Sequence, residues 1–161
     1  MNTKHLLSTI LLLLLCWHSP LFSQIADADY APVIRTIMSY NIRNATNDNG
    51  APDYGNVATT ILRHQPEVVA LQELDSITQR SKNRDVLREV ALLTQYFPIY
   101  GPAIDYDGGK YGLGLLCKHR PLSVNQIPLP GREEARTLLI AEFDDFVMAC
   151  THLSLTEEDR M

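Results

Sequence analysis

Residues 67–73 read Glu67-Val68-Val69-Ala70-Leu71-Gln72-Glu73. A short, continuous apolar run of this kind predicts a strand that is buried on both faces of a sheet. An earlier strand-like run, residues 34–41, ends in Asn41. If the two strands are neighbours, Asn41 and Glu73 reach the same sheet edge, and their oxygens can share one hard cation. Magnesium takes one or two carboxylates together with water and substrate phosphate, so the pair indicates phosphate-ester hydrolysis.

The residues around this run predict two helices that alternate with strands. A helix over about 55–64 is stopped by Gln65-Pro66, because the residue before a proline disfavours helix. A second helix over about 84–95 has Asn83 as its candidate cap. Polar loops are expected at 44–52 and 75–82, and the first strand is expected at 33–42.

From Phe97 onward the pattern is one of short strands separated by turn residues such as Asp107-Gly108-Gly109. This order predicts an α+β fold, a mixed sheet with the helices on one outer face. Residues 156–161 predict the start of a further helix, with acidic residues in its first turn. The strands are expected at 97–104, 112–118, 123–129, 137–142 and 146–153.

Composition is that of a globular domain. The chain has 161 residues, of which 45% are hydrophobic and 20% charged, enough for one domain with a core. The formal net charge is −5, and Lys and Arg are scattered. Proteins that bind duplex nucleic acid through its phosphates usually carry a basic face, so strong duplex binding is not expected.

The N-terminus predicts export. Lys4 precedes an apolar segment, residues 6–15, which is too short to span a bilayer. We expect a signal peptide at 1–24, a linker at 25–32 and one domain at 33–161, in a periplasmic, cell-surface or secreted protein without a transmembrane anchor after cleavage. An uncleaved anchor and lipidation at Cys16 are the alternatives. Cys117 and Cys150 lie in apolar runs, which favours two buried free thiols over a disulfide.

Five short motifs occur in one order along the chain. They are Met38-Ser39-Tyr40-Asn41-Ile42-Arg43, Val69-Ala70-Leu71-Gln72-Glu73-Leu74-Asp75, Tyr111-Gly112-Leu113-Gly114-Leu115-Leu116-Cys117, Glu134-Ala135-Arg136-Thr137-Leu138-Leu139 and Cys150-Thr151-His152-Leu153-Ser154. Together, over residues 33–155, they resemble those of the endonuclease/exonuclease/phosphatase superfamily, the DNase I-like phosphoesterases.

The resemblance implies a four-layer αββα sandwich, of which the chain supplies about the first half. The family also uses a Gly-Asp-x-Asn segment and a terminal Asp-His pair that carries the general base. Neither follows His152 in this sequence. We therefore expect a domain truncated at its C-terminus and inactive by itself.

The resemblance also implies roles for individual residues. Glu73 and Asn41 would hold Mg²⁺ or Mn²⁺, and His152 would donate to a phosphate oxygen. Arg136 would grip the phosphate with its fork, and Tyr111 would contact the substrate. The alternatives are a solvent-exposed Glu73, a turn-forming Asn41, a structural His152, a strand Tyr111, and an Arg136 paired with a neighbouring glutamate. Asp75 is expected to fix the loop after Glu73 rather than to bind metal.

The function implied is hydrolysis of a phosphodiester or phosphomonoester by activated water. The alternative is a noncatalytic remnant, or an exported binding module with a structural cation. The class of phosphate-ester substrate and the oligomeric state stay open from sequence.

Overall fold

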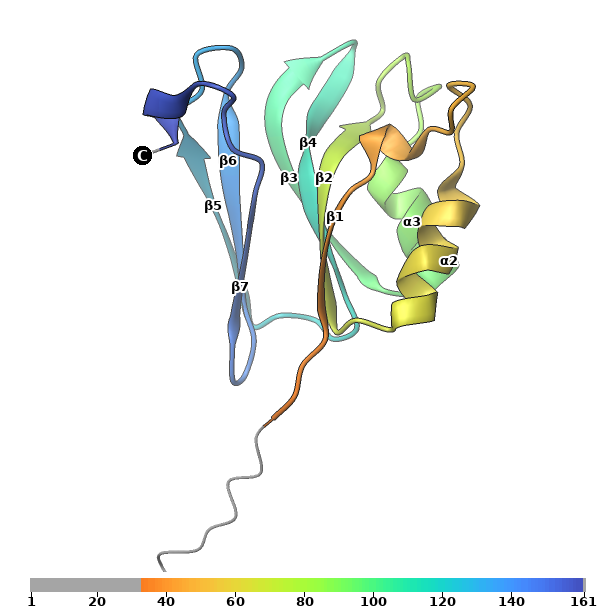
Figure 1. Ribbon diagram of the computed structural model, residues 1–161, viewed down its shortest axis with the longest axis vertical. Helices are drawn as coiled ribbons and strands as arrows, with labels where there is room; N and C mark the ends of the chain where they lie inside the picture. Colours follow the sequence, from red (N-terminus) through yellow and green to blue (C-terminus); the bar gives the residue numbers. More distant parts are fainter. Residues whose placement is uncertain (1–32, 161) are drawn as a thin grey trace, which may run out of the picture. The chain divides into compact units, whose positions relative to one another are not determined.

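Two β-sheets and two α-helices make up the part of the chain that the computed structural model describes, residues 33–160 (Figure 1). The residues from Arg35 onward belong to one unit. The signal peptide expected at 1–24 and the linker expected at 25–32 lie outside the described residues. None of the helices within 33–160 has the length and apolarity that a bilayer crossing requires.

The first sheet is mixed, as the sequence predicts. Its strand order is β1-β2-β4-β3. β1 and β2 are parallel and are joined through α2, whereas β2, β4 and β3 pair antiparallel. The elements are β1 (Ile37–Asn41), α2 (Tyr54–His64), β2 (Val68–Ser76), β3 (Phe97–Tyr106) and β4 (Gly109–Cys117).

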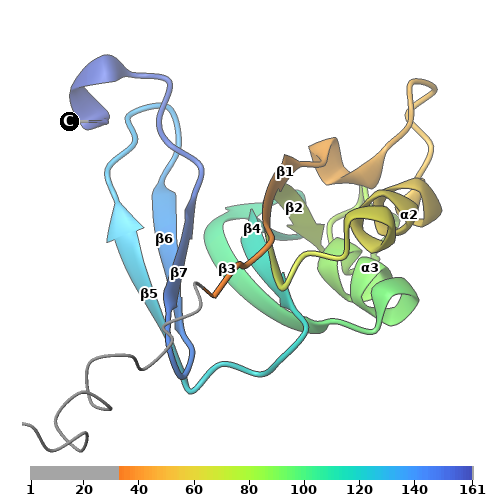
Figure 2. The same ribbon diagram turned by 60° about the horizontal axis from the view of Figure 1, so that its bottom comes forward.

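Both helices pack on one face of this sheet (Figure 2). α2 presents Ile61 and α3 (Val86–Thr94) presents Val90 to Leu71 of β2, and all three side chains are fully buried. Helix α3 begins two residues later than expected. Its cap is Asp85, whose side chain accepts from the backbone N–H of Arg88, so the assignment of Asn83 as the cap is wrong.

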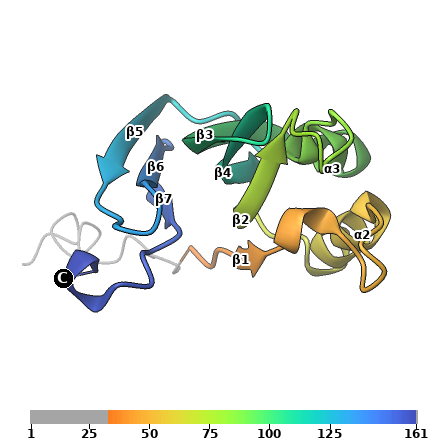
Figure 3. The same ribbon diagram turned by 90° about the horizontal axis from the view of Figure 1, so that it is seen from above.

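The second sheet has three antiparallel strands in the order β5-β6-β7 and faces the first (Figure 3). A second core lies between the sheets, where Leu139 of β6 packs with Leu115 of β4. The helices and two sheets are three layers of the expected four-layer sandwich, and the α+β, DNase I-like prediction is confirmed. The strands are β5 (Ser123–Leu129), β6 (Arg136–Glu142) and β7 (Val147–Thr151).

Several element boundaries differ from those expected. β2 does not end at Glu73 but continues to Ser76, so the loop expected from residue 75 begins later. The turn between β3 and β4 is Asp107-Gly108, where both residues have positive φ (47° and 82°), as a type I′ hairpin requires. The C-terminal residues form a single 3-10 turn, Glu157–Asp159, rather than an α-helix.

The two cysteines are free and buried. Cys117 lies on β4 and Cys150 on β7, in different sheets, which agrees with the expectation of two thiols. Burial raises the pKa of the Cys117 thiol to about 12 and that of Cys150 to about 11. Both therefore stay protonated and unreactive at neutral pH.

Candidate active site

Asn41 and Glu73 meet at the edge of the first sheet. Asn41 is the last residue of β1, and it pairs in register with Gln72 of the parallel strand β2. Its amide Nδ2 donates to Oε1 of Glu73 at 2.6 Å, and its Oδ1 accepts from the backbone N–H of Arg43 at 3.1 Å. These two bonds fix the amide's orientation. Asn41 holds one oxygen of Glu73, and the other oxygen accepts no hydrogen bond from the described residues.

A β-bulge turns Glu73 toward this edge. The pairing of β2 with β4 shifts between Gln72 and Leu74, so Glu73 is the extra residue on its strand. Its φ is 61°, in the left-handed region that residues with a Cβ rarely adopt. Such strain persists only where the surrounding structure imposes it, and it is common at functional sites. The sequence alone did not indicate the bulge, because a regular strand fits the same apolar run.

Asp75 lies fully buried two residues further along β2. Its carboxylate receives Nε and Nη2 of Arg80 at 2.7 and 2.8 Å, and the hydroxyl of Thr78 at 2.9 Å. A bidentate guanidinium pair is the strongest of the ordinary ion pairs. Asp75 thus holds the loop that follows β2, as the sequence interpretation expected, and its oxygens face protein donors.

Asn44 joins this network from the loop after β1. It lies in a left-handed turn in which Arg43, Asn44 and Ala45 all have positive φ (47°, 56° and 52°). With its amide nitrogen toward β2, Asn44 donates to the backbone oxygen of Glu73 at 2.9 Å and accepts from Nη2 of Arg80 at 3.2 Å. The sequence interpretation treated Asn44 only as a loop residue. The one feature of the sequence that could have indicated this turn is the residue type, because asparagine tolerates left-handed backbone.

Tyr111, Arg136 and His152 come together on the side of the second sheet. Tyr111 lies on β4 opposite Asp75, Arg136 begins β6, and His152 directly follows β7. With Glu134 they line one small pocket of about 10 Å³. The structure therefore brings the three residues expected to act on the phosphate to one place, from β4, from the start of β6 and from the residue after β7.

The fork of Arg136 is already engaged. Nη2 pairs with Glu133 at 2.9 Å and Nη1 with Glu134 at 2.7 Å, while the side chain is only 7% exposed. Its Nε has no partner among the described residues, although the atom is buried. Of the two readings that the sequence left open, the pairing with neighbouring glutamates is present, and in a buried rather than a surface setting. The two glutamates take one N–H from each terminal nitrogen, so the guanidinium keeps further N–H groups for a ligand.

Glu133 connects Arg136 to the segment after His152. Besides Arg136, it accepts from the backbone N–H of Leu155 at 2.6 Å and from the hydroxyls of Ser154 and Thr156 at 2.8 and 3.2 Å. The Arg136 guanidinium, followed by the Leu155 N–H, holds the pKa of the Glu133 carboxyl well below its usual range. One carboxylate therefore anchors both the arginine and the chain that carries His152.

Tyr111 links the two groups of residues electrostatically. Burial is the main cause that raises its pKa to about 12, and the charges of Glu73 and Glu134 raise it further. The hydroxyl consequently stays protonated at neutral pH and can donate a hydrogen bond. Tyr111 pairs with Asp75 of β2 and also lines the pocket with Arg136 and His152, so it touches both groups of residues.

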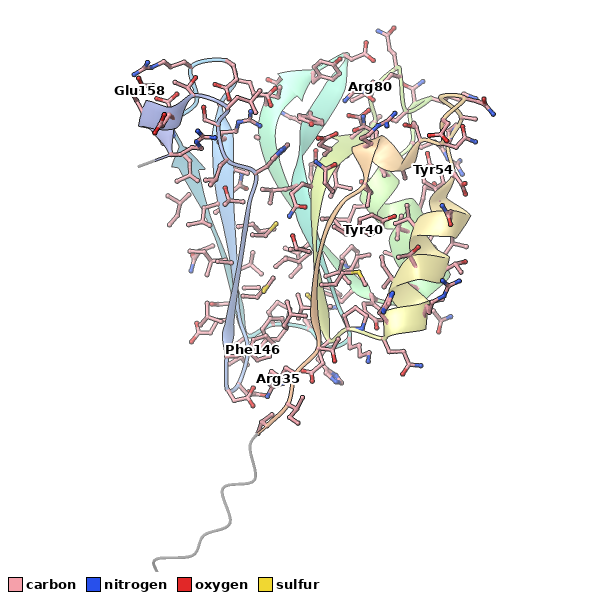
Figure 4. All side chains as sticks on the ribbon, viewed as in Figure 1. Arg35, Tyr40, Tyr54, Arg80, Phe146 and Glu158 are labelled. Carbon is pink, nitrogen blue, oxygen red and sulfur yellow. The ribbon has the colours of Figure 1, made fainter. Side chains whose placement is uncertain are left out.

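A cavity of about 320 Å³ lies away from these residues, at the opposite end of the sheets. There Arg35 pairs with Glu67 and Asp145, and its guanidinium lies 4.5 Å from the ring centroid of Phe146. Figure 4 shows Arg35 and Phe146 at that end and Arg80 at the other. Arg35 thus joins Glu67, just before β2, to Asp145, just before β7, and links the two sheets at this end.

The donor set near Glu73 fits a hard divalent ion. It offers a carboxylate oxygen left free by Asn41, on a strained bulge that fixes its direction. Within residues 33–160, no three His, Cys, Asp or Glu side chains cluster as a metal site. An ion such as Mg²⁺, which keeps several waters and takes few protein ligands, matches one carboxylate better than Zn²⁺ would.

Solved structures with the same fold include an endonuclease/exonuclease/phosphatase from Beutenbergia cavernae, at a TM-score of 0.64 and 21% identity over 78% of this chain and 41% of that one. A humanised D. rerio TDP2 with 14 mutations matches at a TM-score of 0.55 and 24% identity, over 77% of this chain and 49% of that one. ANGEL2, a 2′,3′-cyclic phosphatase, matches at a TM-score of 0.50 and 17% identity, over 77% of this chain and 45% of that one.

The chain thus spans less than half the length of these three solved structures. A comparison with curated protein sequences finds no significant match. The model of one family, described as the Endonuclease/Exonuclease/phosphatase family, matches residues 38–152. Those residues include Asn41, Glu73, Tyr111, Arg136 and His152, and we conclude that the chain belongs to this family.

Proposed function

We propose that the chain forms part of a phosphoesterase that depends on a divalent metal, Mg²⁺ or Mn²⁺, and hydrolyses a phosphodiester or phosphomonoester. The observation that carries the proposal is the hydrogen bond from Asn41 to Glu73 across two parallel strands. Members of this family are hydrolases and generally use divalent metals. ANGEL2, which shares the fold, is a phosphatase.

Each residue of the site has a distinct task in this proposal. Glu73 supplies the oxygen ligand, and Asn41 and the bulge hold that ligand in one direction. The bound ion would neutralise phosphate charge. His152 donates to a non-bridging oxygen, and the guanidinium of Arg136 adds a second, charged donor through N–H groups that the two glutamates leave free. Tyr111 contributes a hydroxyl that is protonated at neutral pH.

The test is hydrolysis of bis(p-nitrophenyl) phosphate and p-nitrophenyl phosphate by the longer phosphoesterase of which this chain is proposed to form part, with Mg²⁺ or Mn²⁺ and with EDTA. We expect metal-dependent turnover that Glu73→Ala abolishes and that Glu158→Ala, a change at an exposed carboxylate, leaves intact. The same protein is titrated with Mn²⁺ by calorimetry. Turnover that Glu73→Ala does not reduce refutes the assignment. Binding of metal without turnover favours the alternative, a binding module with a structural cation.

We also propose that the chain is exported. The support is the basic and then apolar composition of residues 1–15. Expression with a C-terminal tag, followed by fractionation and N-terminal sequencing of the product, tests it. A product in the exported fraction that starts near residue 25 is the expected result, and a cytoplasmic product that retains Lys4 contradicts it.

A further inference from the structure

The backbone of Glu73 is bound from the side of β1. Consecutive carbonyl groups of a regular strand point toward opposite neighbours, so those of Gln72 and Glu73 should bind different strands. Here the oxygen of Gln72 accepts from the backbone N–H of Ile42 at 3.2 Å, and the oxygen of Glu73 accepts from Nδ2 of Asn44 at 2.9 Å. Both donors belong to the segment that directly follows β1, so the side chain of Asn44 continues the β1–β2 pairing by one step.

This bond acts at the residue whose backbone is strained. Glu73 has no partner in the β2–β4 register, which passes from Gln72 to Leu74, and the extra residue of a bulge is generally left unpaired in the ladder. Its φ of 61° costs energy for a residue with a Cβ, and such a conformation persists only where neighbouring groups impose it. The amide of Asn44 supplies a donor that the ladder does not, at the strained residue itself.

Asn44 is itself held in one orientation. Its oxygen accepts from Nη2 of Arg80 at 3.2 Å, and its nitrogen also lies 3.3 Å from Oδ1 of Asp75. Arg80 is fixed in turn, because its Nε and Nη2 both bind the fully buried Asp75, at 2.7 and 2.8 Å. If the amide turned over, its N–H groups would face the guanidinium donors of Arg80. The Asp75–Arg80 pair therefore determines which end of the Asn44 amide faces Glu73.

The residue type at position 44 meets two requirements at once. The φ of Asn44 is 56°, in the left-handed region that asparagine adopts more readily than most residues with a Cβ. Its side chain must also donate to one neighbour and accept from another, as an amide can. Aspartate tolerates the same backbone but has no N–H for the carbonyl of Glu73, and its charge would face Asp75. Glycine tolerates the backbone and has no donor.

We propose that Asn44 is a positioning residue for Glu73: Asn44 fixes the backbone of the bulge, while Asn41 fixes the carboxylate. This inference rests on the proposed phosphoesterase function, in which the carboxylate of Glu73 holds the divalent ion. Metal affinity depends on groups that orient the ligand as well as on the ligand itself. Without the amide of Asn44, residue 73 is released from its left-handed backbone, and its carboxylate is no longer directed toward Asn41. Asn44 thus acts through Glu73 and not by contact with the ion.

Calorimetric titration with Mn²⁺ tests the proposal on Asn44→Gly, which keeps the left-handed backbone and removes only the amide. We expect Asn44→Gly to bind Mn²⁺ about tenfold more weakly than the unmodified protein, the low end of what an orienting residue contributes. Asn83→Gly, at an exposed asparagine with a φ of 58°, is the matched control and should bind normally. Urea denaturation verifies that each variant is folded. An Asn44→Gly variant that loses stability but binds Mn²⁺ as tightly as the unmodified protein overturns the proposal.

A second measurement needs no metal. The urea midpoints of Glu73→Gly and Glu73→Ala are compared twice, once with Asn44 present and once in the Asn44→Gly background. We expect the glycine variant at 73 to have the higher midpoint with Asn44 present, and the difference to shrink without Asn44, because residue 73 is then no longer held in left-handed backbone. A difference of the same size in both backgrounds overturns the proposal.

The two measurements also separate this proposal from the proposed function. If the unmodified protein does not bind Mn²⁺, or if Glu73→Ala binds it equally well, the phosphoesterase assignment is contradicted. The midpoints at position 73 then still decide whether Asn44 fixes the bulge.

Discussion

The amide of Asn41 donates to Oε1 of Glu73 at 2.6 Å although 32 positions separate the two residues in sequence. The parallel pairing of β1 and β2 produces this contact, because parallel strands end at the same sheet edge. The contact also sets the orientation of the Asn41 amide. With its oxygen held by the N–H of Arg43, the amide orients the carboxylate through its nitrogen.

Replacement of Asn41 by alanine should weaken metal binding while leaving the fold intact. Residues that orient a metal ligand typically contribute 10- to 100-fold in affinity, and we expect a loss of about this size for Asn41→Ala. Titration with Mn²⁺ measures it. Asn125→Ala on exposed β5 is the matched control and should bind normally. Unchanged affinity in Asn41→Ala would show that Glu73 does not need the amide.

The bulge predicts an unusual order of stabilities at position 73. Glycine relieves the left-handed strain at φ 61° and alanine does not, so Glu73→Gly should be more stable than Glu73→Ala by about 1 kcal/mol. Urea denaturation measures the difference. At Glu142, within regular β6, the order should reverse because glycine weakens an ordinary strand. An alanine variant at 73 as stable as the glycine variant would exclude strain there.

The Asp75–Arg80 pair should contribute much more to stability than an exposed pair. Asp75→Asn places an amide N–H against guanidinium donors in a buried position, and we expect a loss of about 2–3 kcal/mol. The exposed pair Lys110–Asp105 is the comparison, and Asp105→Asn should cost less than about 1 kcal/mol. Urea denaturation measures the loss of unfolding free energy in each variant. Similar losses in Asp75→Asn and Asp105→Asn would contradict a larger contribution from the buried pair.

Glu133 predicts a dependence of stability on pH. Its pKa is lowered in the folded state, mainly by Arg136, so its contribution is complete above the unfolded value of about 4.3 and is lost as pH falls through the lower folded value. Thermal melting at several pH values between about 3 and 7 should show that the unmodified protein has a higher melting temperature than Glu133→Gln. This difference in melting temperature should narrow toward low pH. Glu157→Gln, at an exposed glutamate, should show no such narrowing, and a constant gap for Glu133→Gln would exclude a charged role.

The layers of the fold follow from periodicity in the sequence. The apolar run Val68–Leu71 is buried on both faces, because helices cover one side and the second sheet covers the other. Helices and most strands were therefore predictable to within a few residues. The choice of cap was not, since Asn83 and Asp85 are both suitable residue types and only the geometry selects Asp85.

The residues of the candidate site were predictable, but most of the hydrogen bonds and ion pairs that hold them were not. The resemblance indicated Asn41, Glu73, Tyr111, Arg136 and His152, and the structure groups them as two sets. The pairing of Arg136 with Glu133 and Glu134 is local, and the sequence offered it as an alternative. The bonds from Ser154 and Leu155 to Glu133, and from Asn44 to the backbone of Glu73, join segments that are far apart in the chain, and no local pattern encodes them.

The bulge in β2 has a consequence for how this protein could change. Leu71 and Leu74 both face the helices only because one additional residue stands between Gln72 and Leu74. Removing Glu73 altogether would restore regular in-and-out alternation and leave every core side chain on its own side. Glu73 is in effect a single-residue insertion in a strand whose core packing does not depend on it. A one-residue deletion at this position would therefore remove the carboxylate without changing which face each core side chain occupies.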